Sequence, residues 1–235
     1  QIIVANIDQV VIVASAKSPR LNLRFIDRLM LIAEFGGVKP GLCINKVDLL
    51  KPKKRAELSD LLTRVYKPLG ATWHMMSATE GENVDVLRDM LAGKFSVFTG
   101  SSGVGKSTIL NALDPSLDIR TRDVSKSSQK GRHTTTFVSI HHLTDLDARI
   151  ADTPGIREVG LWGVPTDTID YYFLEMRPYL GKCKYSDCWH FDEPGCAISG
   201  AVADGDISRV EEIKGHSCVL RRVGGCVLHG DRYCQ

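Results

Sequence analysis

The run Gly100-Ser101-Ser102-Gly103-Val104-Gly105-Lys106-Ser107-Thr108 matches the phosphate-loop pattern G-x-x-x-x-G-K-[ST] without a mismatch. An apolar run at 95–98 precedes it and predicts a buried strand, and apolar residues at helical spacing follow at 109–113. In this setting glycines let backbone N–H groups turn toward phosphate oxygens, and the helix N-terminus adds its positive end. We expect Lys106 to reach the outer phosphates and the Ser107 hydroxyl to bind Mg²⁺. A simple Gly/Ser-rich turn is disfavoured, because spacing, lysine and setting agree.

Segments typical of strands and helices alternate before this loop. A continuous apolar run, typical of a strand buried on both faces, lies at 10–14, and further strands are predicted at 41–44 and 72–76. Apolar residues at helical spacing lie at 23–33, 53–66 and 84–91. The alternation predicts an α/β fold, with a mainly parallel sheet and helices on both of its faces.

The composition sets limits on the class of protein. The chain has 235 residues, enough for one sizeable domain and a small one, and its net charge of +2 does not by itself indicate a nucleic-acid binder. We expect no membrane span, because no apolar run approaches about 18 residues. Of seven cysteines, six follow position 180, which favours a metal in a reducing compartment over disulfides. The chain starts with Gln1 almost directly in a strand, so we expect an upstream part to be missing.

A second motif, Asn45-Lys46-Val47-Asp48, follows a predicted strand and indicates which base is bound. The Asp48 carboxylate can accept from both N1–H and the N2 amine of guanine, whereas adenine offers neither donor. An unpaired buried carboxylate is costly, so the discrimination is strong. Asn45 is expected to hold the base edge and the Lys46 stem to cover the ring. A surface turn is the alternative, disfavoured by the strand before the motif and by the phosphate loop.

Three further segments complete a predicted GTP and Mg²⁺ site. In this context we expect the backbone of Ser77-Ala78 to meet the guanine oxygen, although a plain turn of small residues is equally consistent with the sequence. Asp152 is expected to hold Mg²⁺ through water, and the N–H of Gly155 to meet the γ-phosphate. The run Gly131–Thr136 supplies a switch threonine, for which Thr135 is the candidate among three. This run overlaps the end of a basic loop predicted at 117–133. A hairpin is predicted at 137–140 and 148–151, and Asp152 directly follows its second strand.

A compact set of soft ligands lies near the C-terminus, as Cys183-x4-Cys188-x-His190-x5-Cys196. Zinc prefers four such ligands in a tetrahedron, and short loops deliver them at low entropic cost. The spacing is not the common finger pattern, so buried cysteines with a surface histidine stay an alternative. A second metal is disfavoured at the later group His216, Cys218, Cys226, His229 and Cys234.

The order of these motifs is unusual, because the guanine motif precedes the phosphate loop. In the usual small GTPase the motifs follow the order phosphate loop, switch threonine, D-x-x-G, N-K-x-D. The order in this chain is that of the same fold with its original termini joined and new termini opened elsewhere, a circular permutation that is feasible where the termini lie close together. The chain resembles the circularly permuted ribosome-biogenesis GTPases of the RsgA (YjeQ) family. The resemblance rests on the cysteine cluster and on the segments Val4–Asp8, Asn45–Asp48, Gly100–Thr108, Gly131–Thr136 and Asp152–Ile156.

The resemblance implies a cytoplasmic GTPase, or an organellar one in a eukaryote, that acts late in assembly of the small (30S) ribosomal subunit. It implies binding to that subunit and its rRNA, a monomer, GTP with Mg²⁺, and one structural zinc on the four ligands above. It also implies an N-terminal OB-fold domain that binds RNA, which is absent here. Residues 215–235, rich in Gly, Cys and Val, depart from the charged helical tail that the family leads us to expect.

We therefore expect a circularly permuted Ras-like P-loop GTPase domain at 1–160 and a small, mainly helical zinc-binding domain at 161–235. Ile156 occupies the position where a water-orienting glutamine often follows D-x-x-G, so unaided hydrolysis should be slow. The family suggests that a switch histidine takes part, and His133 occupies that position; its alternative role is to touch RNA. A GTP-gated rRNA-binding scaffold with incidental hydrolysis is the competing function. A P-loop nucleotide kinase is disfavoured by residues 45–48.

Overall fold

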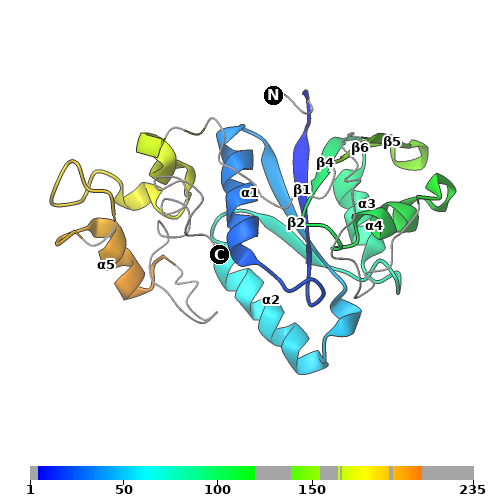
Figure 1. Ribbon diagram of the computed structural model, residues 1–235, viewed down its shortest axis with the longest axis horizontal. Helices are drawn as coiled ribbons and strands as arrows, with labels where there is room; N and C mark the ends of the chain where they lie inside the picture. Colours follow the sequence, from blue (N-terminus) through cyan, green and yellow to red (C-terminus); the bar gives the residue numbers. More distant parts are fainter. Residues whose placement is uncertain (1–4, 120–138, 154–163, 165, 191–192, 208–235) are drawn as a thin grey trace, which may run out of the picture.

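The structure, a computed structural model, describes residues 5–119, 139–153, 164, 166–190 and 193–207. Within these residues a six-stranded sheet runs in the order β3-β2-β1-β4-β6-β5 (Figure 1). Its strands are β1 (Gln9–Ser15), β2 (Lys39–Asn45), β3 (Thr72–Met75), β4 (Phe95–Thr99), β5 (Ser139–Leu143) and β6 (Ala148–Asp152). All neighbouring strands are parallel except β5 and β6, which form an antiparallel pair. The mainly parallel sheet predicted from the sequence is confirmed.

Helices cover both faces of this sheet. They are α1 (Leu23–Phe35), α2 (Pro52–Tyr66), α3 (Val84–Leu91) and α4 (Lys106–Leu113). Along β1, Val11 and Val13 pack with α3 and α4, whereas Ile12 and Ala14 pack with α1 and α2. The two helix pairs accordingly lie on opposite sides of the sheet (Figure 1). Burial on both faces is the reason that the central strands are continuous apolar runs.

Short turns and caps fix the ends of these elements. The side chain of Asn22 caps α1 by accepting a hydrogen bond from the Phe25 N–H at 3.2 Å. Pro52 occupies the first turn of α2, where its missing N–H is not needed. Single 3₁₀ turns lie at η1 (Val47–Leu49), η2 (Pro115–Leu117) and η3 (Thr144–Leu146). The last of these turns closes the β5–β6 hairpin that the sequence predicts.

The described residues between Val164 and Ile207 build a second, smaller cluster beside α1 (Figure 1). Its elements are η4 (Thr166–Tyr172), η5 (Arg177–Tyr179) and α5 (Ala197–Asp204). Leu31 of α1 packs into this cluster, and the rings of Phe35 and Tyr172 meet edge to face at 5.1 Å. Arg177 donates to Glu34 Oε1 at 2.7 Å, which adds an ion pair to the same contact. The C-terminal unit is thus attached to one helix of the sheet domain.

Some predictions fall outside the described residues. The boundary expected near 160 lies within 154–163, most of the basic loop lies within 120–138, and the tail lies within 208–235. The division into two domains therefore stays a prediction. None of the helices in the described ranges is long and apolar enough to cross a membrane.

Candidate nucleotide site and metal cluster

The phosphate loop joins the end of β4 to the start of α4, as the sequence predicts. Gly100, Gly103 and Gly105 have φ values of +153°, +81° and +100°, a region that favours glycine. A Cβ at Gly100 would collide with the carbonyl oxygen of Val13, and one at Gly105 with the side-chain amide of Asn45. The loop therefore needs glycine at these two positions for conformation and for space, which brings its backbone close to the neighbouring strand ends.

Lys106 lies in the middle of this loop rather than in solvent. Its side chain is buried, and Nζ donates to the carbonyl oxygen of Gly100 at 2.9 Å. Burial lowers the pKa of Lys106, while the charge of Asp152 acts in the opposite direction. A buried ammonium held by carbonyl oxygens, at the N-terminus of a helix, is suited to receive an anion.

Asp152, at the end of β6, faces the same region from the neighbouring strand. Burial raises the pKa of its carboxyl group, and the nearby charges of Lys106 and His141 oppose that shift. Among the described residues, Asp152 Oδ1 and Thr99 Oγ1 are buried atoms with no hydrogen-bond partner. An orphaned carboxylate oxygen at the end of β6, which pairs with the strand that leads to the half-buried Ser107, fits a site for hydrated Mg²⁺, whose shell prefers oxygen. The predicted pair of Mg²⁺-binding residues thus lies at one edge of the sheet.

Asn45 is buried and connects three loops. Its Nδ2 donates to the Val104 carbonyl oxygen at 3.0 Å, and its Oδ1 accepts from the Ala78 N–H at 3.1 Å. The amide thus fastens the phosphate loop to the Ser77-Ala78 turn, at the end of the strand that carries the guanine motif. The sequence does not predict these two contacts, because Asn45 is 59 positions from Val104 and 33 positions from Ala78.

Lys46 makes a second connection across the site. It has a left-handed backbone, φ +64°, and its Nζ donates to the carbonyl oxygens of Gly103 and Ser18, each at 2.7 Å. Burial lowers the pKa of Lys46, and Asp48 opposes that shift. Its stem therefore runs from the guanine motif to the phosphate loop, along the course expected for a side chain that covers the base. Ser18, in the loop between β1 and α1, is a contact that no motif in the sequence indicates.

Asp48 is oriented by a hydroxyl group. Ser77 is fully buried, and its Oγ donates to Asp48 Oδ1 at 2.6 Å. The sequence indicates only a backbone role for Ser77, so this side-chain role is an addition. Asp48 is itself exposed, so the burial that makes guanine recognition selective has to come from the bound base.

The predicted metal ligands converge in the C-terminal unit. The sulfur atoms of Cys183, Cys188 and Cys196 and a ring nitrogen of His190 all lie within 4.8 Å of one another. His190 Nδ1 is 3.4 Å from Cys183 Sγ and 3.5 Å from Cys196 Sγ. In a tetrahedral zinc site with Zn–S bonds of about 2.3 Å, ligand atoms are about 3.8 Å apart. Three thiols and one imidazole at this separation fit zinc.

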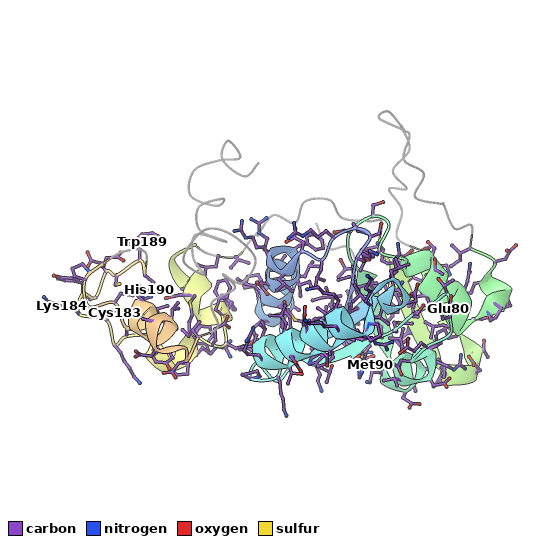
Figure 2. All side chains as sticks on the ribbon, turned by 90° about the horizontal axis from the view of Figure 1, so that it is seen from below. Glu80, Met90, Cys183, Lys184, Trp189 and His190 are labelled. Carbon is purple, nitrogen blue, oxygen red and sulfur yellow. The ribbon has the colours of Figure 1, made fainter. Side chains whose placement is uncertain are left out.

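A backbone N–H group favours the thiolate form of Cys196, whereas burial raises the pKa of Cys188 to about 12. Cys196 is the N-cap of α5, and its Sγ accepts from the Ser199 N–H at 3.4 Å. Burial raises the pKa of Cys196, but hydrogen bonding, chiefly from Ser199, outweighs it and lowers the pKa to about 7. The Ala197 N–H donates to Cys183 Sγ at 3.3 Å. Cys183 and His190 lie together far from Glu80, which follows the Ser77-Ala78 turn (Figure 2), so the metal cluster and the nucleotide site are separate.

Three predicted site residues cannot be placed. His133, Thr135 and Gly155 lie outside the described residues, and their roles stay predictions. The phosphate loop, residues 45–48, Ser77-Ala78 and Asp152 are all brought to the carboxyl edge of the parallel strands. There, hydrogen bonds of Asn45 and Lys46 join the guanine motif directly to the phosphate loop. Along the chain the guanine motif precedes the phosphate loop, the reverse of the usual order. A P-loop GTPase of circularly permuted order is the class of protein that this fold and site define.

Known proteins match the chain closely. The model of the family described as RsgA GTPase matches residues 1–162. A relative from Sodalis glossinidius (strain morsitans), named small ribosomal subunit biogenesis GTPase RsgA, is 45% identical over 208 residues, 88% of this chain and 59% of the relative. One of the same name from Gemmatimonas aurantiaca is 44% identical over 208 residues, 88% of this chain and 66% of the relative. This chain belongs to the RsgA GTPase family, and it spans about three fifths to two thirds of the length of these two relatives.

Solved structures agree with this assignment. The crystal structure of YjeQ from Thermotoga maritima superposes with a TM-score of 0.71 at 31% identity, over 89% of this chain and 69% of that one. The structure of YloQ, described as a circularly permuted GTPase, gives a TM-score of 0.66 at 28% identity, over 88% of this chain and 65% of that one. The expected fold class and the expected family are both confirmed.

Proposed function

We propose that this chain binds and hydrolyses GTP and acts in maturation of the small ribosomal subunit. The observation that carries the proposal is the hydrogen-bonded junction at Asn45, which ties the phosphate loop to the Ser77-Ala78 turn. Its relatives from Sodalis and Gemmatimonas are named as GTPases of small-subunit biogenesis. The site and the names of the relatives thus point to the same activity.

The residues of the site divide between the phosphates and the base. Backbone N–H groups of the phosphate loop receive the phosphates, and Lys106 exchanges its bond to the Gly100 carbonyl for the outer phosphates. Ser107 and Asp152 would hold Mg²⁺, which when bound would neutralise developing charge on the phosphate oxygens. The Gly155 N–H meets the γ-phosphate.

At the other end of the site, Asp48, aligned by Ser77, accepts from the guanine N1–H and N2 amine. The Lys46 stem covers the ring, and the Ala78 backbone faces the guanine oxygen. Asn45 supports the base site indirectly, because its amide holds the two loops that flank the base.

Hydrolysis is expected to be slow in the free chain. Ile156 follows Gly155 directly and has no group that orients water. Residues 117–133 carry five basic residues against two acidic ones, so the loop is attracted to a phosphate backbone. Docking on rRNA would then bring Thr135 to where it would bind Mg²⁺, and His133 near the attacking water. The small ribosomal subunit is thereby both the partner and the activator.

The remaining assignments follow from the same site. One structural zinc on Cys183, Cys188, His190 and Cys196 leaves no open position for catalysis. The working form is a monomer in the cytoplasm, or in an organelle of a eukaryote. A scaffold in which hydrolysis is incidental is not favoured, because the relatives are named as GTPases.

The experiment compares GTP binding and Mg²⁺-dependent turnover of the chain with those of Lys106→Ala. Lys106 is buried in the loop and is the cation assigned to the outer phosphates. This variant should therefore lose tight GTP binding and turnover, with the sheet domain still folded. Lys94→Ala is the matched control, since its ammonium bonds the Met90 carbonyl oxygen away from the loop. Turnover by Lys106→Ala equal to that of the control would refute the proposed site.

A further inference from the structure

Asp170 lies on the outer side of the metal cluster. Its Oδ2 is 3.4 Å from His190 Nε2, while the opposite ring nitrogen, Nδ1, lies beside the sulfurs of Cys183 and Cys196. The His190 side chain is 7% exposed, so this ring has a fixed, largely dry setting. The two nitrogens of one imidazole thus face a carboxylate and a group of thiols.

A neutral imidazole carries one proton, and the position of that proton decides which nitrogen can bind a metal. With the proton on Nε2, that nitrogen donates to Asp170 and the Nδ1 lone pair points toward the three thiols. The second carboxylate oxygen, Oδ1, accepts from the Tyr171 N–H at 2.9 Å, which holds the carboxylate group in place. A carboxylate behind a zinc-bound histidine typically fixes the tautomer and makes the nitrogen more basic.

We propose that Asp170 is a positioning residue for the metal site, which holds His190 in the tautomer that presents Nδ1 to zinc. The inference rests on the proposed zinc site and adds a residue 20 positions before the histidine. Asp170 belongs to η4, whose Tyr172 packs on Phe35 of α1. The same short segment therefore orients a zinc ligand and attaches the C-terminal unit to the GTPase domain.

The test measures zinc affinity of the whole chain by competition with a chelator, for wild type, Asp170→Ala and Asp170→Asn. The asparagine keeps an oxygen for the Tyr171 N–H but turns an NH₂ group toward His190 Nε2–H, which removes the acceptor. Both variants should bind zinc about 10–100-fold more weakly. Asp187→Asn is the control, an exposed aspartate in the same cysteine-bearing loop, and should match wild type.

The outcomes separate the possible roles of Asp170. Wild-type affinity in Asp170→Asn would overturn the proposal, because the carboxylate would then matter only for the backbone of Tyr171. Nitrogen NMR of the zinc-loaded wild type is the second readout and depends on no variant. It should show His190 with a protonated Nε2 and a metal-bound Nδ1; the reverse assignment would overturn the proposal. If wild type binds no zinc at all, the proposed zinc site itself fails, which metal analysis shows directly.

Discussion

Replacement of Asn45 by alanine tests the junction between the guanine motif and the phosphate loop. The change removes a donor to the Val104 carbonyl and an acceptor for the Ala78 N–H, and both backbone groups belong to buried residues. Each buried polar group that loses its partner costs about 1–3 kcal/mol. We therefore expect the free energy of unfolding to fall by about 2–4 kcal/mol, since water and relaxation recover part of the sum.

Nucleotide binding should fall as well, because the freed loops have to be ordered again by the ligand. If about 2 kcal/mol of the loss appears in binding, the Kd for GTP rises about thirtyfold. The measurements are denaturant unfolding of the nucleotide-free chain and titration with a fluorescent GTP analogue.

Asn111→Ala is a matched control for this prediction. Asn111 also makes two side-chain bonds to one backbone segment, donating to the Ile119 carbonyl at 2.8 Å and accepting from the Ile119 N–H at 2.9 Å. It should lower stability and leave the GTP affinity of the free chain unchanged, because Ile119 lies beyond α4 and outside the phosphate loop. Equal GTP affinity in Asn45→Ala and Asn111→Ala would refute the reasoning that the junction shapes the nucleotide site.

Three further predictions concern the base, the metal and the Mg²⁺-binding carboxylate. Asp48→Asn should weaken GTP and favour xanthosine triphosphate, whose C2 oxygen accepts from the new amide; unchanged GTP preference in competition binding would remove Asp48 from the base site. Metal analysis should find about one zinc per chain, and little in the double variant Cys188→Ala/Cys196→Ala, while chelation leaves GTP binding intact because the two sites share no residue. Burial raises the pKa of Asp152 above its ordinary 3.8. The buried carboxylate therefore lowers the free energy of unfolding at higher pH: the loss is absent below pH 3.8 and develops as the pH rises from there through the raised pKa. Asp152→Asn should therefore flatten that part of the stability–pH curve and lose Mg²⁺-dependent GTP binding; an unchanged curve with unchanged binding would contradict both roles.

The sequence predicts those parts of the site that depend on local backbone and residue type. The glycines at 100 and 105 are required by backbone angles and close approach, and a nine-residue motif expresses that requirement directly. The strands β1 and β2 are equally clear, because burial on both faces demands continuous apolar residues. The four metal ligands also fall close together in the chain, so spacing alone brings them to one candidate cluster.

The contacts that the sequence does not predict join residues far apart in the chain. Lys46 to Ser18, Ser77 to Asp48 and Asp170 to His190 each depend on how separate elements pack, which no local spacing encodes. The contact between Arg177 and Glu34 spans 143 positions and could not be expected from either segment. A serine or aspartate near a motif is a weak signal, since such residues are equally common in solvated turns.

Stimulation of GTP hydrolysis by purified small ribosomal subunits tests the proposed function most directly, with wild type and His133→Ala measured side by side. We expect slow turnover of the free chain and strong acceleration by subunits, which added salt should weaken because phosphate contacts carry the docking. Placement of one general acid–base group is worth on the order of 10²–10⁴ in rate, so His133→Ala should lose most of the acceleration and still bind GTP. Full acceleration of His133→Ala would remove the histidine from the mechanism. Subunits that leave wild-type turnover unchanged would contradict the claim that they activate this GTPase.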